Sequence, residues 1–482
     1  MPRDEEAVTV SDTQTEPASD GDCLAPPMEP VETIRTVPSD APQELFAESF
    51  HIDDDLSTVQ RLPMELLSNI FVHLDDQEGD GQLIPWDSDA RYHAHNMAVT
   101  IACVCRTWRA VARATGKIWT RIMIDDNTRH WQAYADTCLV LSGNYDLTIQ
   151  CNLTFIMPIV LRMLLPHASR WRVVELRGRF AEIWALAQSK RSFPNLRCVS
   201  IASDYLCSAV PQPFDFLEGS SQINNLLVEA SFCDPDYVFS LPPLAGITRF
   251  QLNIHDSELY SPASLLHALE PSGCILQSLS ARFRTAIDFP QVTSLHPVFL
   301  PALRKLSLDC AAHVYMRSIV APNVEELSFY PLGDRPLWME DDPYSSLSAF
   351  FSSPQSPQAV RELRLMVHVS EVDEDACRVL LSCLKRLDSL RVLQIAYSVR
   401  PTNTLGASEG LIRALIVRDD EGPLLPNLCS MEFKATNEYY RGADRETLQT
   451  LLQTVASSRV TPRVVCGRNV VALSRFEVGI PQ

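Results

Sequence analysis

Lysine and glycine are scarce in this chain of 482 residues. Five lysines stand against thirty-six arginines, and Lys+Arg total 41 against 60 Asp+Glu, which gives a formal net charge of -19. Such an acidic chain is poorly suited to nucleic acid or an anionic membrane surface as its main partner. Among the 16 glycines we find no Gly-rich phosphate loop, and we find no nucleophile elbow or His-Glu-x-x-His motif. These absences argue against catalysis, and an enzyme with an unrecognised site stays as an alternative.

Long apolar runs are absent as well. Met1 to Glu6 has no apolar stretch typical of a secretory signal, and the run Phe155 to Leu165 is short and interrupted by Arg162. We therefore expect no membrane-spanning segment. The 14 cysteines are scattered without a regular framework, and a chain of this length does not need disulfides to fold. We expect reduced thiols and a cytoplasmic and/or nuclear location.

Residues 1–57 are rich in Asp, Glu, Pro, Ser and Thr. Residues 1–55 hold fifteen Asp/Glu and two Arg, a net charge of -13. With few large apolar side chains, such a segment cannot offset the entropy of ordering. We predict a disordered acidic tail.

The stretch from Leu62 to Trp119 carries two apolar stripes at helical spacing. Pro63 suits the first position of a helix, where its missing N–H would have no partner anyway. The first stripe comprises Leu66, Leu67, Ile70, Phe71 and Leu74, and the second comprises Ile101, Val104, Cys105, Trp108, Val111 and Ala112. We interpret the two stripes as two or three short helices. About sixty residues cannot bury both stripes internally, so part of this surface should meet another chain or domain.

In this order the residues resemble the F-box, the helical module by which substrate receptors dock onto a Skp-type adaptor of cullin–RING ubiquitin ligases. The resemblance rests on Leu-Pro-x-Glu-Leu-Leu-x-x-Ile-Phe-x-x-Leu from Leu62, Val-Cys-Arg-x-Trp-Arg from Val104, and an apolar-Trp pair that ends at Trp119. The connection from Asp75 to Met97 is longer and more polar than in the family, which leaves the course of the second helix open.

The resemblance implies adaptor-binding residues and a function. By position the residues are Leu62, Pro63, Leu66, Leu67, Ile70, Phe71, Val104, Cys105, Trp108 and Trp119, of which the last four contribute partly to the core of the module. The implied function is that of a non-catalytic substrate-recognition subunit of an SCF-type ubiquitin ligase. Its partners would be the Skp-type adaptor, the cullin scaffold and an unknown protein target. The alternative is a scaffold that holds partner proteins without directing ubiquitination.

From Trp119 onward one spacing recurs: an apolar residue, two others, an apolar residue, one other and an apolar residue. This is the strand signature of a leucine-rich repeat. Its first positions are Trp119, Asn144, Trp171, Leu196, Ile223, Ile247, Leu276, Leu303, Val324, Val360, Leu390 and Leu428. A Pro two or three residues ahead of several strands indicates a recurring turn, as in Phe193 to Leu196 and Leu425 to Leu428.

Helical segments are predicted between the strands, at Phe180–Lys190, Ala263–Leu269, Asp373–Leu387 and Leu411–Arg418. The predicted fold is therefore α/β: a disordered tail at 1–57, an F-box-like helical domain at 58–118, and a degenerate leucine-rich-repeat solenoid with a parallel sheet at 119–482. The gap before Val360 contains loop signals at 331–357, and a helix at Glu446–Ser457 with Val464 to Cys466 should cap the open end. A conventional α/β domain is the alternative.

No metal or cofactor is expected. The spacing of His93 and His95 with Cys103 and Cys105 is the only cluster with imaginable zinc geometry. We favour an apolar role for the cysteines because both fall inside the second predicted helix.

Residues that alternate with the buried positions of the strands should face away from the core. This set is polar and of mixed charge, which suits a protein ligand better than a small molecule in a dry pocket. The predicted target-binding residues are Arg249, Gln251, Arg282, Lys305, Asp309, Tyr330, Glu362 and Arg364. The insertion at 331–357 should join this footprint, and a merely solvated face is the alternative.

Overall fold

The computed structural model describes residues 62–76, 97–153, 155–183, 186, 191–206, 217, 220–232, 241, 244–255, 262–284, 296–330, 343–368, 374–398, 406–435 and 442–479. The predicted acidic tail lies outside these residues. The chain from Thr58 to Gln482 forms one compact unit. Its main apolar core runs without a break from Leu67 to Val455, across the predicted boundary at 118/119.

The N-terminal part of this unit is helical. It consists of α1 (Met64–Asp76), α2 (Met97–Val104), α3 (Arg106–Ala114) and the 3-10 helix η3 (Gly116–Trp119). Cys103 lies inside α2 as expected, but placing Cys105 inside a helix is wrong, because this residue separates α2 from α3. Cys105 is extended (φ -156°) and caps α3, where its Sγ accepts a hydrogen bond from the backbone N–H of Trp108. Such side-chain capping satisfies an N–H that would otherwise lack a partner.

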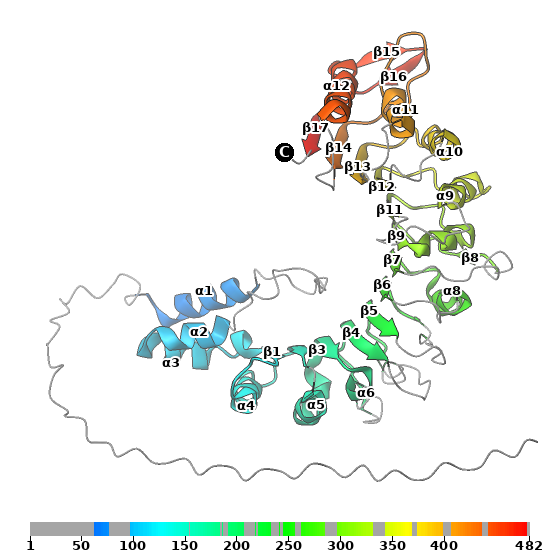
Figure 1. Cartoon of the computed structure of the whole chain (residues 1–482). Coiled ribbons are helices and arrows are strands. Elements are labelled where there is room, and N and C mark those ends of the chain that lie inside the picture. Colours follow the sequence, from blue (N-terminus) through cyan, green and yellow to red (C-terminus); the bar gives the residue numbers. More distant parts are fainter. Residues whose placement is uncertain are drawn as a thin grey trace, which may run out of the picture. The chain divides into compact units, whose positions relative to one another are not determined.

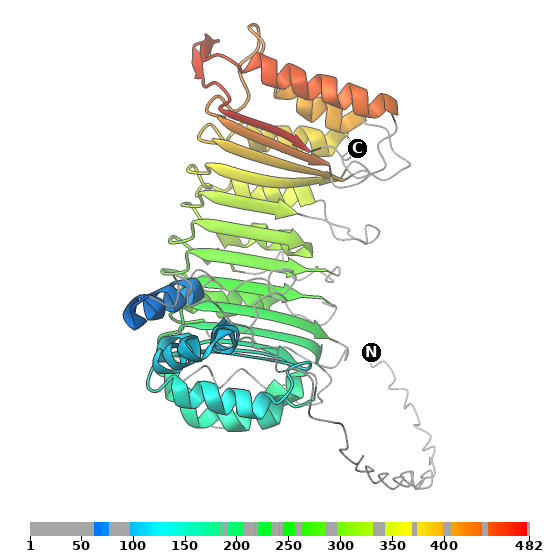
Figure 2. The ribbon, with the colours of Figure 1, turned by 90° about the vertical axis from the view of Figure 1, so that its left-hand side faces the viewer.

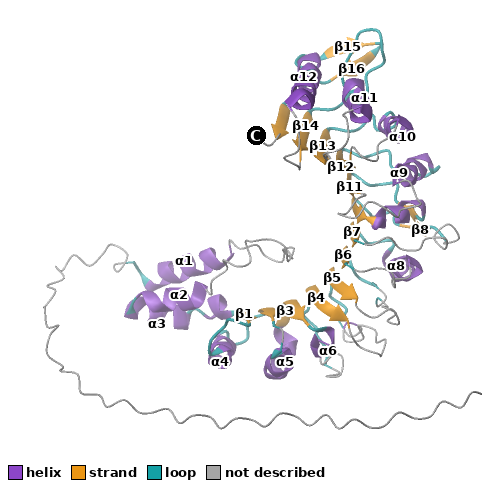
Figure 3. Ribbon diagram, in the orientation of Figure 1, coloured by secondary structure: helices purple, strands orange, loops and turns teal. Residues whose placement is uncertain are grey.

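Thirteen strands of the described residues form one sheet in which all neighbouring strands are parallel (Figures 1 and 3). In sheet order they are β1 (Arg121–Asp125), β2 (Leu147–Asn152), β3 (Trp171–Gly178), β4 (Cys198–Leu206), β5 (Asn225–Phe232), β6 (Arg249–Ile254), β7 (Ser278–Phe283), β9 (Lys305–Cys310), β11 (Glu326–Tyr330), β12 (Glu362–His368), β13 (Val392–Ser398), β14 (Ser430–Ala435) and β17 (Arg475–Gly479). The twelve predicted strands are confirmed. β17 was not predicted.

The connecting helices lie on the convex side of the curved sheet (Figure 1). They are α4 (Trp131–Leu141), α5 (Met157–Leu164), η4 (Leu165–Arg170), α6 (Phe180–Ile183), α8 (Pro262–Leu269), η6 (Glu270–Ser272), η8 (Ala311–Arg317), α9 (Pro343–Ser352), α10 (Glu374–Leu384), α11 (Gly406–Ala414) and α12 (Gly442–Ser458). The core between helices and sheet is built of apolar rows in strand register, such as Leu279, Leu306, Leu327, Leu363 and Leu393. Each fully buried Leu stabilises the fold by about 2 kcal/mol.

Several predicted bounds need correction. The helix expected at Leu411–Arg418 ends at Ala414. The helix expected at Phe180–Lys190 is described only as far as Ile183, with residues 187–190 outside the described part. The insertion expected to be a loop contains α9, whose Tyr344, Leu347, Phe350 and Phe351 are buried. The loop reading fails because the Pro and Ser residues that suggested it lie at the ends of this apolar helix.

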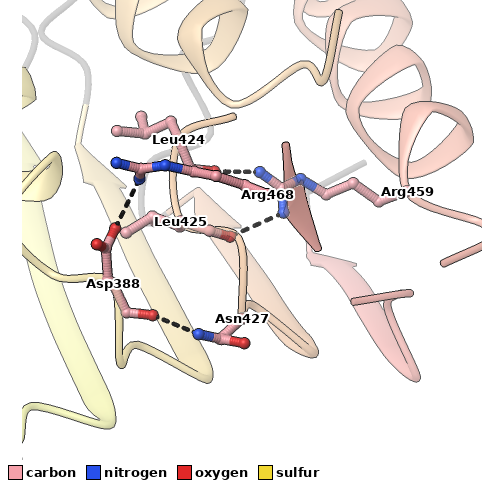
Figure 4. Close-up of polar contacts among 6 residues, drawn as sticks. All are labelled: Asp388, Leu424, Leu425, Asn427, Arg459 and Arg468. Atoms are coloured by element: carbon pink, nitrogen blue, oxygen red, sulfur yellow. Dashed lines mark hydrogen bonds and ion pairs between the residues drawn. The ribbon is translucent and has the colours of Figure 1, made fainter. Parts of the chain in front are cut away.

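The Pro turns ahead of the strands carry an asparagine that links neighbouring repeats. The side-chain Nδ2 of Asn195 donates to the carbonyl of Ser169 at 2.8 Å, and that of Asn323 donates to the carbonyl of Pro301 at 2.8 Å. Asn427 makes the same bond to the carbonyl of Asp388 at 2.7 Å (Figure 4). Each bond satisfies a carbonyl at a strand entrance, so the turn helps to fix the stacking of one repeat on the next.

The C-terminal end adds a hairpin of β15 (Arg463–Val465) and β16 (Arg468–Val470). A second small parallel pair, β8 (Val298–Phe299) with β10 (Ile319–Val320), lies outside the main sheet. Arg459 is fully buried, and its guanidinium donates to the carbonyls of Leu425 (3.0 Å) and Leu424 (Figure 4). Its Nε also donates to the carbonyl of Leu415 (3.2 Å). Burial lowers the pKa of Arg459 to about 10, with a smaller contribution from Arg463. The helix expected at Glu446–Ser457 lies within α12, and β17 continues the sheet past β14.

Candidate functional site

The first helix has two apolar stripes with different surroundings. Leu66 (50% exposed), Ile70 (44%) and Leu74 (39%) follow one another at i, i+4 and i+8, so they form one exposed row. Leu67 and Phe71 lie on the other side and are buried. One apolar side of α1 is therefore core, and the other is a free surface.

The predicted adaptor-binding residues divide accordingly. Leu67, Phe71 and Trp119 are interior residues: the Phe71 ring lies 5.1 Å from the Trp108 ring, and Trp119 Nε1 donates to the carbonyl of Ala112 at 2.7 Å. Treating Phe71 as part of one exposed stripe is thus wrong, because its side chain is the packing centre between α1 and α3. Leu62, Cys105 and Trp108 are half-buried, while Pro63 and Val104 are exposed.

A second contact joins α1 to the end of α3. The Ser68 and Thr115 hydroxyls lie 2.8 Å apart, and Thr115 also donates to the carbonyl of Val111. The module has two further exposed aliphatic side chains, Val104 (58% exposed) and Val99 (38%), both on α2. These side chains define the docking stripe: Leu66, Ile70, Leu74, Val99 and Val104. Exposed apolar groups gathered on so small a module are typical of an interaction surface.

No metal site appears within the described part of the chain, where no three His, Cys, Asp or Glu side chains gather. Cys103 is exposed and Cys105 serves as a helix cap, while His93 and His95 fall outside the described residues. Among the helices that the structure describes, none has the length and apolar character needed to cross a membrane.

The inner face of the sheet is the side opposite the helices (Figure 2). Strand register sorts its side chains into three rows, which pass through Lys305, Ser307 and Asp309 of β9. The eight predicted target-binding residues all lie in these rows, on β6, β7, β9, β11 and β12. The structure therefore brings them onto one surface.

Ion pairs along and between strands neutralise much of the charge on this surface. Arg282 bonds to Asp309 through Nε (3.0 Å) and Nη2 (2.8 Å), across β7 and β9. Lys305 lies 2.7 Å from Glu326, and Arg364 lies 2.6 Å from Glu362. Burial raises the pKa of Asp309, although the charge and hydrogen bonds of Arg282 act in the opposite direction.

Tyr330 is a half-buried member of the predicted target-binding set. The pKa of its phenol is raised, mainly by burial and also by the charge of Asp309. The positive charges of Arg364 and Lys434 act in the opposite direction. Its hydroxyl thus remains protonated and surrounded by charges of both signs. Tyr and Arg side chains in such partly buried positions commonly anchor protein interfaces.

Sequence reasoning missed one pair on this surface. His255, which follows β6, places Nε2 3.0 Å from Oε1 of Glu229 on β5. Burial raises the pKa of Glu229, but the hydrogen bond and charge of His255 and the charge of Arg177 outweigh it, and the net pKa is lowered. The alternation of inner-face and core-face residues along the strand could have indicated His255, since it stands two residues after Asn253, which faces inward.

The described chain thus combines a small helical module that has an exposed apolar stripe with a long parallel sheet of strand–helix repeats. Residues 59–125 match the family model described as F-box-like. The chain thus contains an F-box-like domain, followed by a parallel sheet consistent with a leucine-rich-repeat type of domain. F-box proteins are generally non-catalytic adaptors, and an F-box domain implies binding to a Skp-type adaptor.

No curated protein matches the chain. Among solved structures, a protein from Bacteroides fragilis is similar at 12% identity and a TM-score of 0.27, over 57% of this chain and 78% of that chain. A TM-score this low carries no argument about fold or function.

Proposed function

We propose that this chain is a non-catalytic substrate receptor of an SCF-type ubiquitin ligase. Its F-box-like domain binds a Skp-type adaptor that joins it to a cullin scaffold, and the inner face of its repeats binds a protein target. The chain itself contributes proximity between the target and the ubiquitin-charged enzyme. A location in the cytoplasm and/or the nucleus is part of this proposal.

The docking stripe is the observation that carries the proposal. Its members are 38% to 58% exposed although all are aliphatic, whereas Leu67 and Phe71 of the same helix are almost completely buried. A helix with apolar residues on both sides needs a second partner for the exposed side. In an F-box-like domain that partner is the adaptor.

The test is Leu66→Ala with Ile70→Ala in the full chain, followed by affinity purification and mass spectrometry. Each truncated anchor should weaken binding by about 2 kcal/mol, so adaptor and cullin should be lost together. Asn69→Ala, an exposed polar position on the same helix, is the matched control. Phe71 is unsuited to this test because its removal would unpack α1 from α3. Wild-type recovery of adaptor and cullin with the double variant contradicts the docking assignment.

The target face has its own test. Tyr330→Ala with Arg364→Glu should abolish capture of target proteins and leave adaptor recovery unchanged, since both residues lie on the inner face. Arg378→Glu on the convex helix α10, where Arg378 is 74% exposed, is the control. Unchanged target recovery would move the target site elsewhere.

The turnover of the captured proteins distinguishes a substrate receptor from the alternative, a scaffold. For a receptor, captured proteins should accumulate when the proteasome is inhibited, and only if the docking stripe is intact. Proteins that bind the inner face yet keep the same half-life in both backgrounds would favour a scaffold.

A further inference from the structure

The two edges of the sheet differ in how they end. Among the described strands, β1 forms one edge and β17 forms the other (Figure 1). The core-facing side chains of β1, Ile122 and Ile124, are 0% and 2% exposed. In β17 the core-facing Phe476 is half-buried and Val478 is 39% exposed. The apolar core is therefore closed at β1 and reaches the surface at β17.

Side chains also occupy the backbone groups at the β1 edge. The hydroxyl of Tyr134 on α4 accepts a hydrogen bond from the N–H of Met123 at 3.3 Å and donates to the carbonyl of Arg121 at 3.2 Å. The N–H of Asp125 donates to the hydroxyl of Thr128 at 3.0 Å. These groups lie on the side of β1 away from β2. Side chains that occupy an edge in this way keep other strands from pairing there.

The edge formed by β17 is open to another strand. Among the described strands, β17 pairs only with β14. The N–H of Arg475 donates to the carbonyl of Cys429, which directly precedes β14. Because the backbone groups of successive residues in a strand point to opposite sides, those of Phe476 and Val478 point away from β14. An arriving strand would find hydrogen-bonding groups and apolar side chains at the same two positions.

The inner face of β17 carries one charge of each sign. Nε of Arg475 lies 2.7 Å from Oε1 of Glu477, and these side chains are 66% and 47% exposed. Charged side chains on an edge strand commonly discourage pairing with other chains. This protection does not act against a strand that carries the same two charges in the opposite order. A second copy of β17 that runs antiparallel to the first is such a strand.

We propose that the β17 edge is a self-association site, at which β17 pairs antiparallel with β17 of a second copy about a two-fold axis at Phe476. Arg475 then stands opposite Glu477 of the second copy, and Glu477 stands opposite its Arg475, so both cross-strand pairs attract. Phe476 lies beside Phe476 of the second copy on the core side of the sheet, which adds an aromatic contact.

The charges select this register from its neighbours. Two copies can pair only if outward-pointing residues such as Phe476 and Val478 oppose one another, so the register changes in steps of two residues. A register centred on Arg475 opposes two arginines, and one centred on Glu477 opposes two glutamates. Like charges directly opposite destabilise a pair of strands. Only the register centred on Phe476 brings opposite charges together, at about 4.5 Å between Cα atoms.

This association goes beyond the proposed receptor function and does not depend on it. A two-fold axis perpendicular to the sheet keeps both inner faces on the same side, so the two copies share one continuous sheet. The contact between two five-residue strands is small. We therefore expect a weak dimer, with a dissociation constant on the order of ten to a hundred micromolar. The competing occupant of the edge is an extended segment of another protein.

Sedimentation velocity of the full chain, from about 1 to 300 µM, tests the proposal. The parent should dimerise over this range. Arg475→Glu alone, and Glu477→Arg alone, should each weaken dimerisation at least about tenfold, because two attractive pairs become repulsive. An equimolar mixture of these two variants should dimerise again, since one then carries two carboxylates where the other carries two guanidinium groups. This rescue also shows that both variants are folded.

The double variant Arg475→Glu, Glu477→Arg tests the register. Exchanging the two charges keeps them complementary only when the pairing is centred on Phe476, so this variant should dimerise like the parent. Val478→Pro removes an N–H that points away from β14 and should weaken dimerisation at least about tenfold. Glu362→Arg is the matched control, because it breaks the same kind of pair with Arg364 within the inner strand β12. It should leave dimerisation unchanged.

A parent chain that stays monomeric overturns the proposal and leaves the edge to a segment of another protein. Single variants that dimerise like the parent overturn it as well, and so does a mixture that stays monomeric. A double variant that fails to dimerise overturns the register centred on Phe476. None of these measurements uses the adaptor or a target, so their failure is distinct from failure of the receptor function.

Discussion

The inner faces of β3–β5 and β12–β14 share one backbone pattern and differ in everything that lies on it. In the first region six of the nine inner side chains are buried, Leu227 and Glu175 among them. The second region is half-open and carries charges paired within one strand, such as Arg364 with Glu362 and Lys434 with Glu432. Equivalent repeats therefore need not offer equivalent surfaces. One end of this sheet buries six of its nine inner side chains, and the other end leaves all nine half-buried or exposed.

The largest difference between the two regions is expected when a carboxylate is introduced into each of them and the unfolding free energies are compared. Leu227→Glu buries an unpaired carboxylate and should lower the unfolding free energy by about 3 kcal/mol. Gln394→Glu, in the same row of β13, should change it by less than about 0.5 kcal/mol. Urea midpoints of the two variants and the parent measure this. Equal losses of unfolding free energy in the two variants would show that the Leu227 side chain is not buried in solution.

The next largest effect concerns the ion pairs between the two regions. Arg282→Leu leaves Asp309, whose side chain is 11% exposed, without its cation, and should destabilise the fold by about 2 kcal/mol. Lys305→Leu breaks the exposed pair with Glu326 and should cost less than about 0.5 kcal/mol. Thermal melts at neutral pH compare them. Arg282→Glu is less suitable, because it would combine this loss of stability with any effect on target binding.

The smallest effects should appear as opposite pH dependences. In the folded chain the pKa of Glu229 is lowered below 4.5. Glu229 therefore stabilises the folded state fully above that pH, and this contribution is lost as the pH falls through the folded-state pKa. The pKa of Asp309 is raised above 3.8, so its contribution is complete below that value and is lost as pH rises through the folded pKa.

Relative to the parent, Glu229→Gln should therefore lose stability as pH rises from about 3 to 6, and Asp309→Asn should gain it. Chemical unfolding at several pH values gives both slopes. Slopes of the same sign would mean that the surroundings of the two carboxylates do not differ as described.

The repeats were predictable because every strand buries the same three positions. β17 was missed although Leu473, Phe476 and Val478 repeat the spacing. Leu473 stands 45 residues after Leu428, with α12 and a hairpin between them, and Val478 remains 39% exposed. The signal was present, but distance from the preceding strand and weak burial concealed it.

The docking site was only partly predictable. Leu66 and Leu67 are the same residue type, and periodicity cannot tell which of two apolar stripes meets the core. That choice depends on Trp108 and Trp119, which come forty or more residues later in the chain. The break at Cys105 was hidden because it lasts one residue, which leaves the apolar spacing intact.

The buried guanidinium of Arg459 has a mechanical consequence. It ties the end of α12 to the end of α11 and to the turn before β14, three points that span the last two repeats. Elsewhere the asparagine turns join only adjacent repeats, so a solenoid stretched from its ends would yield one unit at a time. When the C-terminus is pulled, β14 and its neighbours should instead give way as a single block, in one rupture event of double length.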